Sequence, residues 1–175
     1  ATEKIQNLLN DLLELSRVGR LINKPKPVPF RQIVTEAIEL VHGRISQGGV
    51  AVSVADDLPT VYVDHRRLVE VMQNLIDNAV KFTEQGRIQI GARISDGRLH
   101  CWVADTGIGI CADDQRCIWN EFYQVDDRAS ARYRGAGLGL TLVHDLLTLL
   151  EGDSMLTSEP GSGTRIDFSL PVTPV

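Results

Sequence analysis

Apolar side chains recur at steps of three and four residues along residues 2–18, a pattern that predicts an amphipathic helix. The stripe consists of Ile5, Leu8, Leu12 and Leu15, widened by Leu9 and Leu13. Alternating steps of three and four are typical of a coiled-coil seam, so this helix needs a partner helix or a second copy to cover its stripe. The alternative is a terminal helix that folds back on its own domain. Prolines at positions 25, 27 and 29 then end any helix and predict a hinge or an edge strand.

Helical and strand patterns interleave through the rest of the chain. The expected helices span residues 31–44, 65–82 and 137–150, and the expected strands span 50–54, 61–63, 87–94, 99–104, 154–157 and 164–170. Asp64 is a good N-cap for the second helix, and Asp96-Gly97 is a hairpin signal. Because several strands pair as hairpins, we expect a mixed sheet with helices on one face. Residues 105–134 lack a regular pattern, and a loop of that length is usually functional or mobile.

Composition and charge exclude some classes of function. The 175 residues carry a net charge of -5, and the isoelectric point is near 5.3, which argues against a general affinity for nucleic acid. Three cysteines (Cys101, Cys111 and Cys117) include no CxxC pair, so we interpret them as reduced thiols of a cytoplasmic protein. No apolar run reaches the roughly 18 residues that span a bilayer. The chain begins with Ala1 inside a helical pattern, so we expect a piece of a longer protein, which can itself be membrane-anchored.

Two asparagines stand in the middle of the second predicted helix. Asn74 and Asn78 are four residues apart, which places both amides on one face, with Lys81 on the neighbouring ridge. Asparagine is a poor helix former because its side chain competes for backbone hydrogen bonds. A carboxamide oxygen suits Mg²⁺, which normally arrives with phosphates, and a lysine would supply a charge to the same phosphates. The alternative is a pair of half-buried amides with purely structural hydrogen bonds.

A glycine-containing segment, Asp105-Thr-Gly107-Ile-Gly109-Ile, directly follows an apolar strand. Glycines allow a tight turn and a close approach of the backbone to a ligand. Asp105 at the strand end can accept a hydrogen bond from an exocyclic amine such as that of adenine. The spacing of Gly107, Gly109 and Ala112 also matches the dinucleotide fingerprint, which requires a helix after the glycines and a parallel βαβ unit. No convincing second strand follows here, so we do not favour that alternative.

A second glycine segment, Gly135-Ala-Gly137-Leu-Gly139-Leu, opens the third predicted helix. Alternate glycines before a helix expose backbone N–H groups beside the positive helix end, so the segment predicts an anion site that suits a triphosphate. The alternative is close helix packing through small residues. Gly163-Thr164, between the last two strands, is by itself only a turn.

Together these segments resemble the catalytic, ATP-binding domain of sensor histidine kinases, which belongs to the Bergerat-fold superfamily with gyrase, mismatch-repair ATPases and heat-shock chaperones. The matching boxes are the asparagine box at residues 74–83, the first glycine box at 105–110, the phenylalanine box at 118–124 and the second glycine box at 135–140. The resemblance implies an α+β two-layer sandwich, with a mixed, largely antiparallel sheet and three helices on one face. It also places Gly163-Thr164 where the family closes its adenine pocket.

The resemblance implies a role for each matching residue. Nucleotide binding falls to Asn74, Asn78, Lys81, Phe82, Asp105, Gly107, Gly109, Ile110, Arg132, Gly135, Gly137, Leu138, Gly139, Leu140 and Thr164. The catalytic residues would be Asn74, Asn78 and Lys81, with Asn78 coordinating the Mg²⁺ that bridges the phosphates. Asp105 would bind the adenine amino group. Residues 111–134 would form the lid over ATP, with Arg132 as one candidate phosphate contact.

The resemblance also implies a domain organisation and partners. Residues 1–22 would end the dimerisation and phosphotransfer hairpin, 23–29 would be a linker, and 30–175 would be the catalytic domain. The family's acceptor histidine lies on the first helix of that hairpin, and no histidine of this chain has its context. The expected partners are therefore ATP, the helical domain of a homodimeric parent and a response regulator, with no nucleic acid.

Two alternative functions share this fold. One is a nucleotide-binding regulatory module that has lost phosphotransfer, and the other is an anti-sigma-type serine kinase. A gyrase-like motor is less favoured, because such relatives carry a carboxylate base where this chain has Asn74. The chain departs from the family pattern at Cys111, Trp119 and Gln124, which puts lid packing and turnover in doubt.

Overall fold

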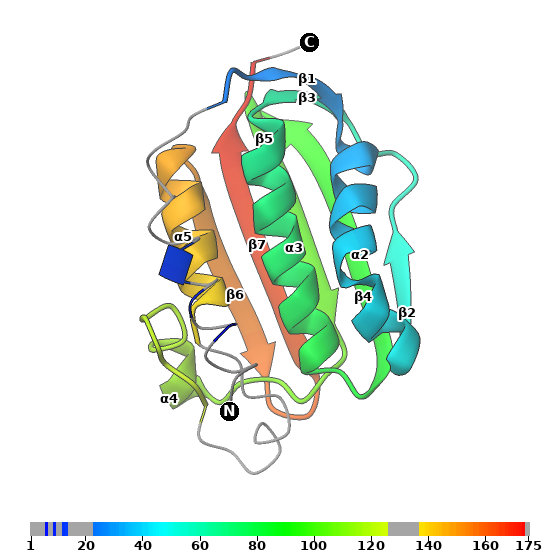
Figure 1. Ribbon diagram of the computed structural model, residues 1–175, viewed down its shortest axis with the longest axis vertical. Coiled ribbons are helices and arrows are strands. Elements are labelled where there is room, and N and C mark those ends of the chain that lie inside the picture. Colours follow the sequence, from blue (N-terminus) through cyan, green and yellow to red (C-terminus); the bar gives the residue numbers. More distant parts are fainter. Residues whose placement is uncertain (1–5, 7–8, 10–11, 14–22, 126–136, 174–175) are drawn as a thin grey trace.

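One five-stranded sheet forms the framework of the molecule (Figure 1). The computed structural model describes residues 6, 9, 12, 13, 23–125 and 137–173. The strands of the main sheet are β2 (Gly49–Val54), β4 (Gln85–Ser95), β5 (Arg98–Asp105), β6 (Asp153–Glu159) and β7 (Gly163–Pro171), in the order β2-β4-β5-β7-β6. Only the β2–β4 pair is parallel, so the sheet is mixed and largely antiparallel, as expected.

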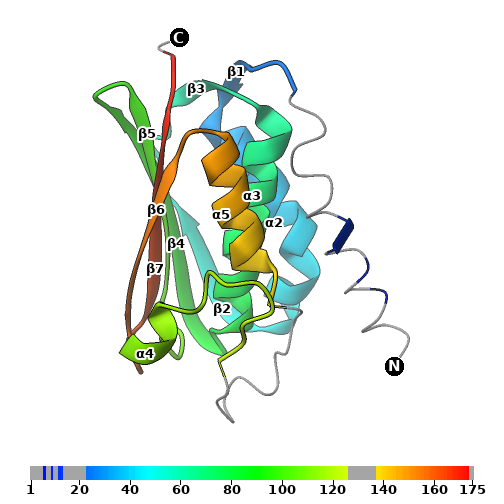
Figure 2. The same cartoon turned by 90° about the vertical axis from the view of Figure 1, so that its left-hand side faces the viewer.

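Three long helices cover one face of this sheet, as Figure 2 shows in profile. They are α2 (Phe30–Gln47), α3 (His65–Lys81) and α5 (Gly139–Leu149), and a short helix, α4 (Ala112–Gln115), lies at one end of the molecule. A separate two-stranded sheet pairs β1 (Lys26–Pro29) with β3 (Thr60–Val63). The predicted two-layer sandwich with three helices on one face is therefore confirmed.

The local signals for the second helix and for the hairpin act as predicted. The side chain of Asp64 accepts a hydrogen bond from the backbone N–H of Arg67 at 3.2 Å, which caps the start of α3. Asp96 and Gly97 both have positive φ, of 53° and 71°, as a two-residue turn between antiparallel strands requires. This turn fixes the register of β4 against β5, in which Ser95 faces Arg98.

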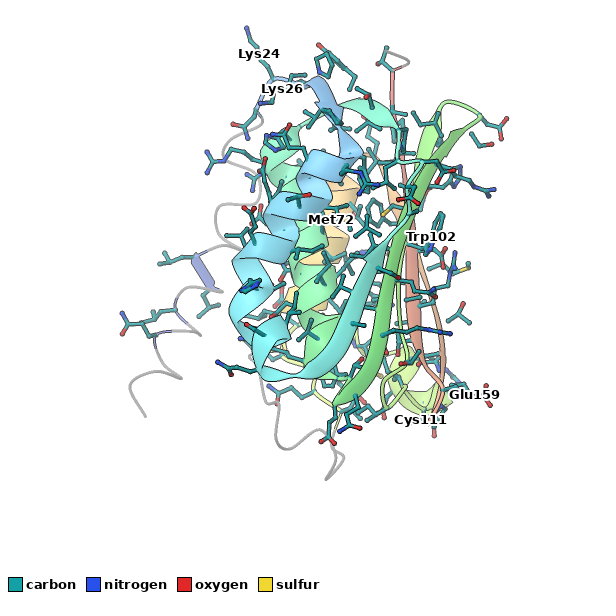
Figure 3. The ribbon with its side chains drawn as sticks, turned by 90° about the vertical axis from the view of Figure 1, so that its right-hand side faces the viewer. Lys24, Lys26, Met72, Trp102, Cys111 and Glu159 are labelled. Carbon is teal, nitrogen blue, oxygen red and sulfur yellow. The ribbon has the colours of Figure 1, made fainter. Side chains whose placement is uncertain are left out.

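The core lies between the sheet and the helices. Alternate residues of the central strands point toward the helices, so Ile88, Ile90, Leu99 and Cys101 are almost completely buried. Their neighbours point to the other face of the sheet. Figure 3 shows Met72 on the helix side and Trp102 at the outer side of the sheet. The packing of α3 on the strands therefore fixes the helix that carries the asparagine pair.

The segment before α2 is folded onto the domain. Val28 of β1 is 2% exposed, and Asn23 donates its backbone N–H to the Asp64 carboxylate at 2.9 Å. The expected division between a linker at 23–29 and a domain from residue 30 stays a prediction, and most of the helix expected at 2–18 lies outside the described residues. Within the described part of the chain, no helix has the length and apolar character to cross a membrane.

Candidate functional site

A pocket lies between the C-terminal half of α3, the start of α5 and the glycine segment after β5. The predicted nucleotide-binding residues that line it are Asn74, Asn78, Lys81, Phe82, Asp105, Gly109, Ile110, Gly137, Leu138, Gly139, Leu140 and Thr164. The fold thus gathers segments that are far apart in the sequence into one site. Arg132 and Gly135 lie outside the described residues, as does the part of the expected lid from residue 126 to 134.

The two asparagine amides converge on the first residue of α5. A Cβ placed on Gly139 would lie 3.4 Å from Asn74 Oδ1 and 3.6 Å from Asn78 Nδ2. Asn74 donates its amide to the carbonyl of Glu70 at 2.9 Å, which leaves its Oδ1 pointing toward α5. Gly139 therefore keeps open a space bounded by amide groups on one side and by a helix start on the other.

The start of α5 leaves backbone N–H groups for a ligand. Its N-cap is Leu138, which provides no side-chain hydrogen bond, and the first turn contains no acidic residue. The first N–H groups of a helix have no partner within the helix, and the helix dipole adds positive potential there. Since Leu138 and Gly139 line the pocket, this end of α5 can bind an anion.

Lys81 enters the same pocket from α3, where Asp77 holds it. Lys81 Nζ lies 3.3 Å from Asp77 Oδ2, and Arg44 of α2 lies 3.0 Å from Asp77 Oδ1. All three side chains are partly exposed, so these ion pairs contribute little to stability. Their effect is to hold the lysine on the helix that carries the asparagine amides. The group has two cations and one carboxylate, so it keeps a net positive charge.

Asp105 lines the same pocket from the end of β5. Its Oδ1 accepts two backbone hydrogen bonds, from Gly107 N–H at 2.8 Å and from Thr164 N–H at 3.2 Å. Burial raises the pKa of the carboxyl, and these N–H groups oppose the rise by favouring the charged form. Because both backbone bonds go to one oxygen, Oδ2 is the oxygen placed to accept a hydrogen bond from a ligand.

Gly107 is not at the pocket surface, in contrast to Gly109. A Cβ on Gly107 would lie 2.1 Å from the carbonyl oxygen of Phe82, so the glycine lets the segment after β5 pack against the end of α3. The adjacent Ile108 N–H donates to the same carbonyl at 3.0 Å. Gly107 thus positions Asp105 against α3 and shapes the pocket from behind.

The segment after Gly109 forms one wall of the site and is anchored to β6. Ile110 N–H donates to Ser158 Oγ at 2.8 Å, and the Gln115 side chain donates to the Ser158 carbonyl at 2.9 Å. Figure 3 places Cys111 and Glu159 together at this end of the molecule. The helix that follows, α4, has four residues, and β5 is antiparallel to both of its neighbours. The dinucleotide-fingerprint alternative is therefore wrong.

Tyr123 closes the pocket on the side of α4. Its hydroxyl donates a hydrogen bond to Asp114 Oδ1, and Cys111 Sγ lies 2.9 Å from the other oxygen of that carboxylate. The hydrogen bond to Asp114 raises the pKa of Tyr123 to about 12, because ionisation of the phenol would remove the donated proton. The structure therefore links α4 to a residue that lines the pocket.

Several lining residues were not predicted from the sequence. They are mostly apolar and include Leu75, Val103, Ile118, Tyr123 and Ile166. Val103 and Ile166 are inward-facing residues of adjacent strands, so the alternation of those strands marks them as core without showing that they border a ligand. Apolar lining with few polar groups is typical of a small-molecule site.

The described residues contain no group of three or more His, Cys, Asp or Glu side chains arranged to hold a metal ion. The oxygen donors that α3 contributes to the pocket lining are the amides of Asn74 and Asn78 and the carboxylate of Asp77. That donor set suits Mg²⁺, which keeps several waters and shares the oxygens of bound phosphates.

Comparisons with known proteins agree with this geometry. The family of histidine kinase-, DNA gyrase B- and HSP90-like ATPases matches residues 63–174, and the chain belongs to this family. The methanogenesis regulatory histidine kinase FilI of Methanothrix harundinacea is 35% identical over 98% of the chain, which spans 19% of that protein. The autoinducer 2 sensor kinase/phosphatase LuxQ of Vibrio cholerae is 32% identical over 97% of the chain, which spans 21% of it.

Solved structures show the same fold. Full-length ShkA, crystallised in complex with AMPPNP, is 32% identical and superposes with a TM-score of 0.85 over 98% of this chain and 36% of its own. The histidine kinase AdeS of Acinetobacter baumannii is 23% identical, with a TM-score of 0.79 over 99% of this chain and 81% of its own. The chain thus spans about a fifth of the curated relatives it matches.

Proposed function

We propose that the chain is the ATP-binding catalytic unit of a sensor histidine kinase. The observation that carries the proposal is the convergence of Asn74 and Asn78 on the start of α5, in a pocket that a carboxylate at the end of β5 also lines. An anion site and a hydrogen-bond acceptor in one pocket match the phosphates and the adenine amino group of ATP. The amide at position 74, where gyrase-like relatives have a carboxylate base, favours a kinase over a motor ATPase.

The residues of the pocket divide between the two ends of the nucleotide. Asp105 Oδ2 accepts a hydrogen bond from the adenine amino group, and Thr164 and Ile110 border the base. The phosphates lie toward Gly139, where the α5 N–H groups and Lys81 offset their charge. The remaining predicted contacts at Phe82, Gly137, Leu138 and Leu140 border the nucleotide. Arg132 belongs to the proposed lid, and Gly135 to the glycine segment before α5.

Asn78 Oδ1 would hold Mg²⁺ in this site, with the Asn74 amide beside it. When bound, the ion neutralises charge on the phosphate oxygens. The support is the position of the two amides within van der Waals range of one point at the start of α5.

In the whole protein, the proposed reaction transfers the γ-phosphoryl group of ATP to a histidine of the helical domain. A bond forms between an imidazole nitrogen and the γ-phosphorus, the bond to the β,γ-bridging oxygen breaks, and ADP leaves with that electron pair. Neutral imidazole is already a nucleophile near pH 7, so the pocket needs no strong base. The contribution of this chain is to position the phosphates and to neutralise their charge.

The partners proposed for the whole protein follow from this reaction. They are a helical phosphotransfer domain, a second copy of the parent and a response regulator that takes the phosphoryl group from histidine. We place the unit in the cytoplasm, where ATP is available.

A phosphotransfer assay tests the proposal. The chain is mixed with the parent's helical domain and ATP labelled in the γ-phosphate, and acid-labile phosphohistidine is measured. The proposal predicts labelled histidine that requires Mg²⁺ and is lost in Asn78→Ala. ATP binding without phosphohistidine would favour a regulatory module, and acid-stable phosphoserine on an added protein would favour a serine kinase.

A further inference from the structure

One buried hydroxyl beside the pocket has no hydrogen-bond partner among the described residues. Thr83 is 3% exposed, and its Oγ1 is completely buried and unsatisfied. Burying a hydroxyl without a partner costs free energy, so such a group in a folded protein needs an explanation. Thr83 follows Phe82 at the end of α3, which is the same helix that carries the asparagine pair.

The hydroxyl faces the segment that carries Asp105. A Cβ on Gly107 would lie 2.8 Å from Thr83 Oγ1, so only the absence of a side chain at Gly107 lets this hydroxyl approach the turn after β5. Burial raises the pKa of the Asp105 carboxyl, and after the Gly107 and Thr164 N–H groups the Thr83 hydroxyl is the next group that lowers it. The hydroxyl therefore lies beside the turn that carries Asp105, where it favours the charged form of the carboxyl.

The two backbone N–H groups bond only one oxygen of the Asp105 carboxylate. Both bonds go to Oδ1, and Oδ2 is the oxygen proposed to meet the adenine amino group. A donor beside Oδ2 would fix the orientation of the carboxylate about its last torsion angle, which is otherwise broad. Thr83 Oγ1 is a buried donor without a partner beside the turn that carries Asp105.

We infer that Thr83 is a positioning residue for base recognition, and that its hydroxyl holds the Asp105 carboxylate toward the adenine amino group when nucleotide binds. This inference rests on the proposed nucleotide function of the pocket. Thr83 acts through Asp105 and does not touch the base. Its contribution therefore depends on whether the bound base offers an amino group.

The test compares two diphosphates that differ at that group. ADP carries the amino group, and inosine diphosphate carries a carbonyl oxygen in its place. Dissociation constants for both are measured by calorimetry on the wild-type chain, on Thr83→Val, which removes the hydroxyl at nearly constant volume, and on Thr83→Ser, which keeps it. We expect Thr83→Val to weaken ADP binding about tenfold and to change the dissociation constant of inosine diphosphate by less than about twofold. Thr83→Ser should bind both nucleotides with affinities close to those of the wild type.

Thr141→Val is the matched control. Thr141 is 6% exposed and donates to the Trp119 carbonyl at 3.1 Å, so its substitution also removes a buried hydroxyl without touching Asp105. It should leave the ratio of the two dissociation constants unchanged. If Thr83→Val does not fold, Thr83→Ala provides the same comparison without the added methyl group.

Each outcome decides one of the claims. If Thr83→Val loses affinity for both nucleotides equally, or loses no affinity for ADP, the positioning role is overturned while the proposed function stands. If the wild-type chain binds neither nucleotide, the proposed function fails and this inference fails with it. Equal wild-type affinity for the two nucleotides removes the role of Asp105 and therefore that of Thr83.

Discussion

Gly139→Ala separates the stability of α5 from the function of the pocket. Gly139 is the first residue of α5 and does not have a positive φ, so alanine can adopt its conformation. The added Cβ would meet Asn74 Oδ1 at 3.4 Å and Asn78 Nδ2 at 3.6 Å, which are ordinary contacts without a clash. The ligand-free protein should therefore accept the substitution, while the methyl group occupies the space between the amides and the helix start.

The two expected effects have opposite signs. Replacing glycine with alanine at a compatible position stabilises a protein by about 0.4–1 kcal/mol, mainly by restricting the unfolded chain. For a domain of this size, that corresponds to a rise in the unfolding temperature of roughly 1–4 °C. In the pocket, loss of one charge-assisted contact to metal or phosphate should weaken ATP binding by about tenfold or more.

The assay pairs thermal unfolding without ligand with calorimetric titration of Mg-ATP. Gly43→Ala is the matched control, because Gly43 lies on the exposed side of α2 and an added Cβ would meet no atom within 4 Å. It should give a similar stabilisation with unchanged ATP affinity. Wild-type ATP affinity in a folded Gly139→Ala protein would refute the placement of the phosphates at the start of α5.

Three further predictions concern other parts of the structure. Asp64→Ala removes the N-cap of α3 and the anchor of Asn23, and urea unfolding should show a loss of about 1–2 kcal/mol; an unchanged midpoint would contradict the capping role. The phenol of Tyr123 should ionise near pH 12 in an ultraviolet titration, and Asp114→Asn should lower its pKa toward 10.0, because the carboxylate favours the protonated phenol; a midpoint that does not move would argue against their hydrogen bond. Lys81→Ala should weaken ATP binding about tenfold and leave adenosine binding unchanged, whereas equal losses would show that the lysine does not act on the phosphates.

Most of the fold could be predicted because local signals and hydrophobic pattern agree. The asparagine helix has a capping aspartate and a regular apolar face, and the hairpin has an Asp-Gly turn, so each element was placed within a few residues. The strand pairing β2-β4-β5-β7-β6 was not predictable in that detail, since the parallel β2–β4 pair depends on contacts between distant segments. The short helix at Ala112–Gln115 lies in a stretch without apolar periodicity and was also missed.

The polar residues of the site were easier to predict than its shape. Asn74 and Asn78 stand out because asparagine is unfavourable in the middle of a helix, and Asp105 stands out because it joins an apolar strand to a glycine segment. The lining by Val103 and Ile166 could not be separated from the core, because inward-facing strand residues look alike whether they meet a helix or a pocket. The burial of Thr83 Oγ1 without a partner also depends on tertiary packing, through the close approach of Gly107 to α3.

Calorimetric titration of the chain with Mg-ATP, beside the variant Asp105→Ala, tests the central claim most directly. The account predicts saturable binding of one ATP per wild-type chain, and binding at least about tenfold weaker in a variant that unfolds at a similar temperature. No saturable binding by the wild type, or equal affinity in the folded variant, would contradict the assignment of this pocket to ATP.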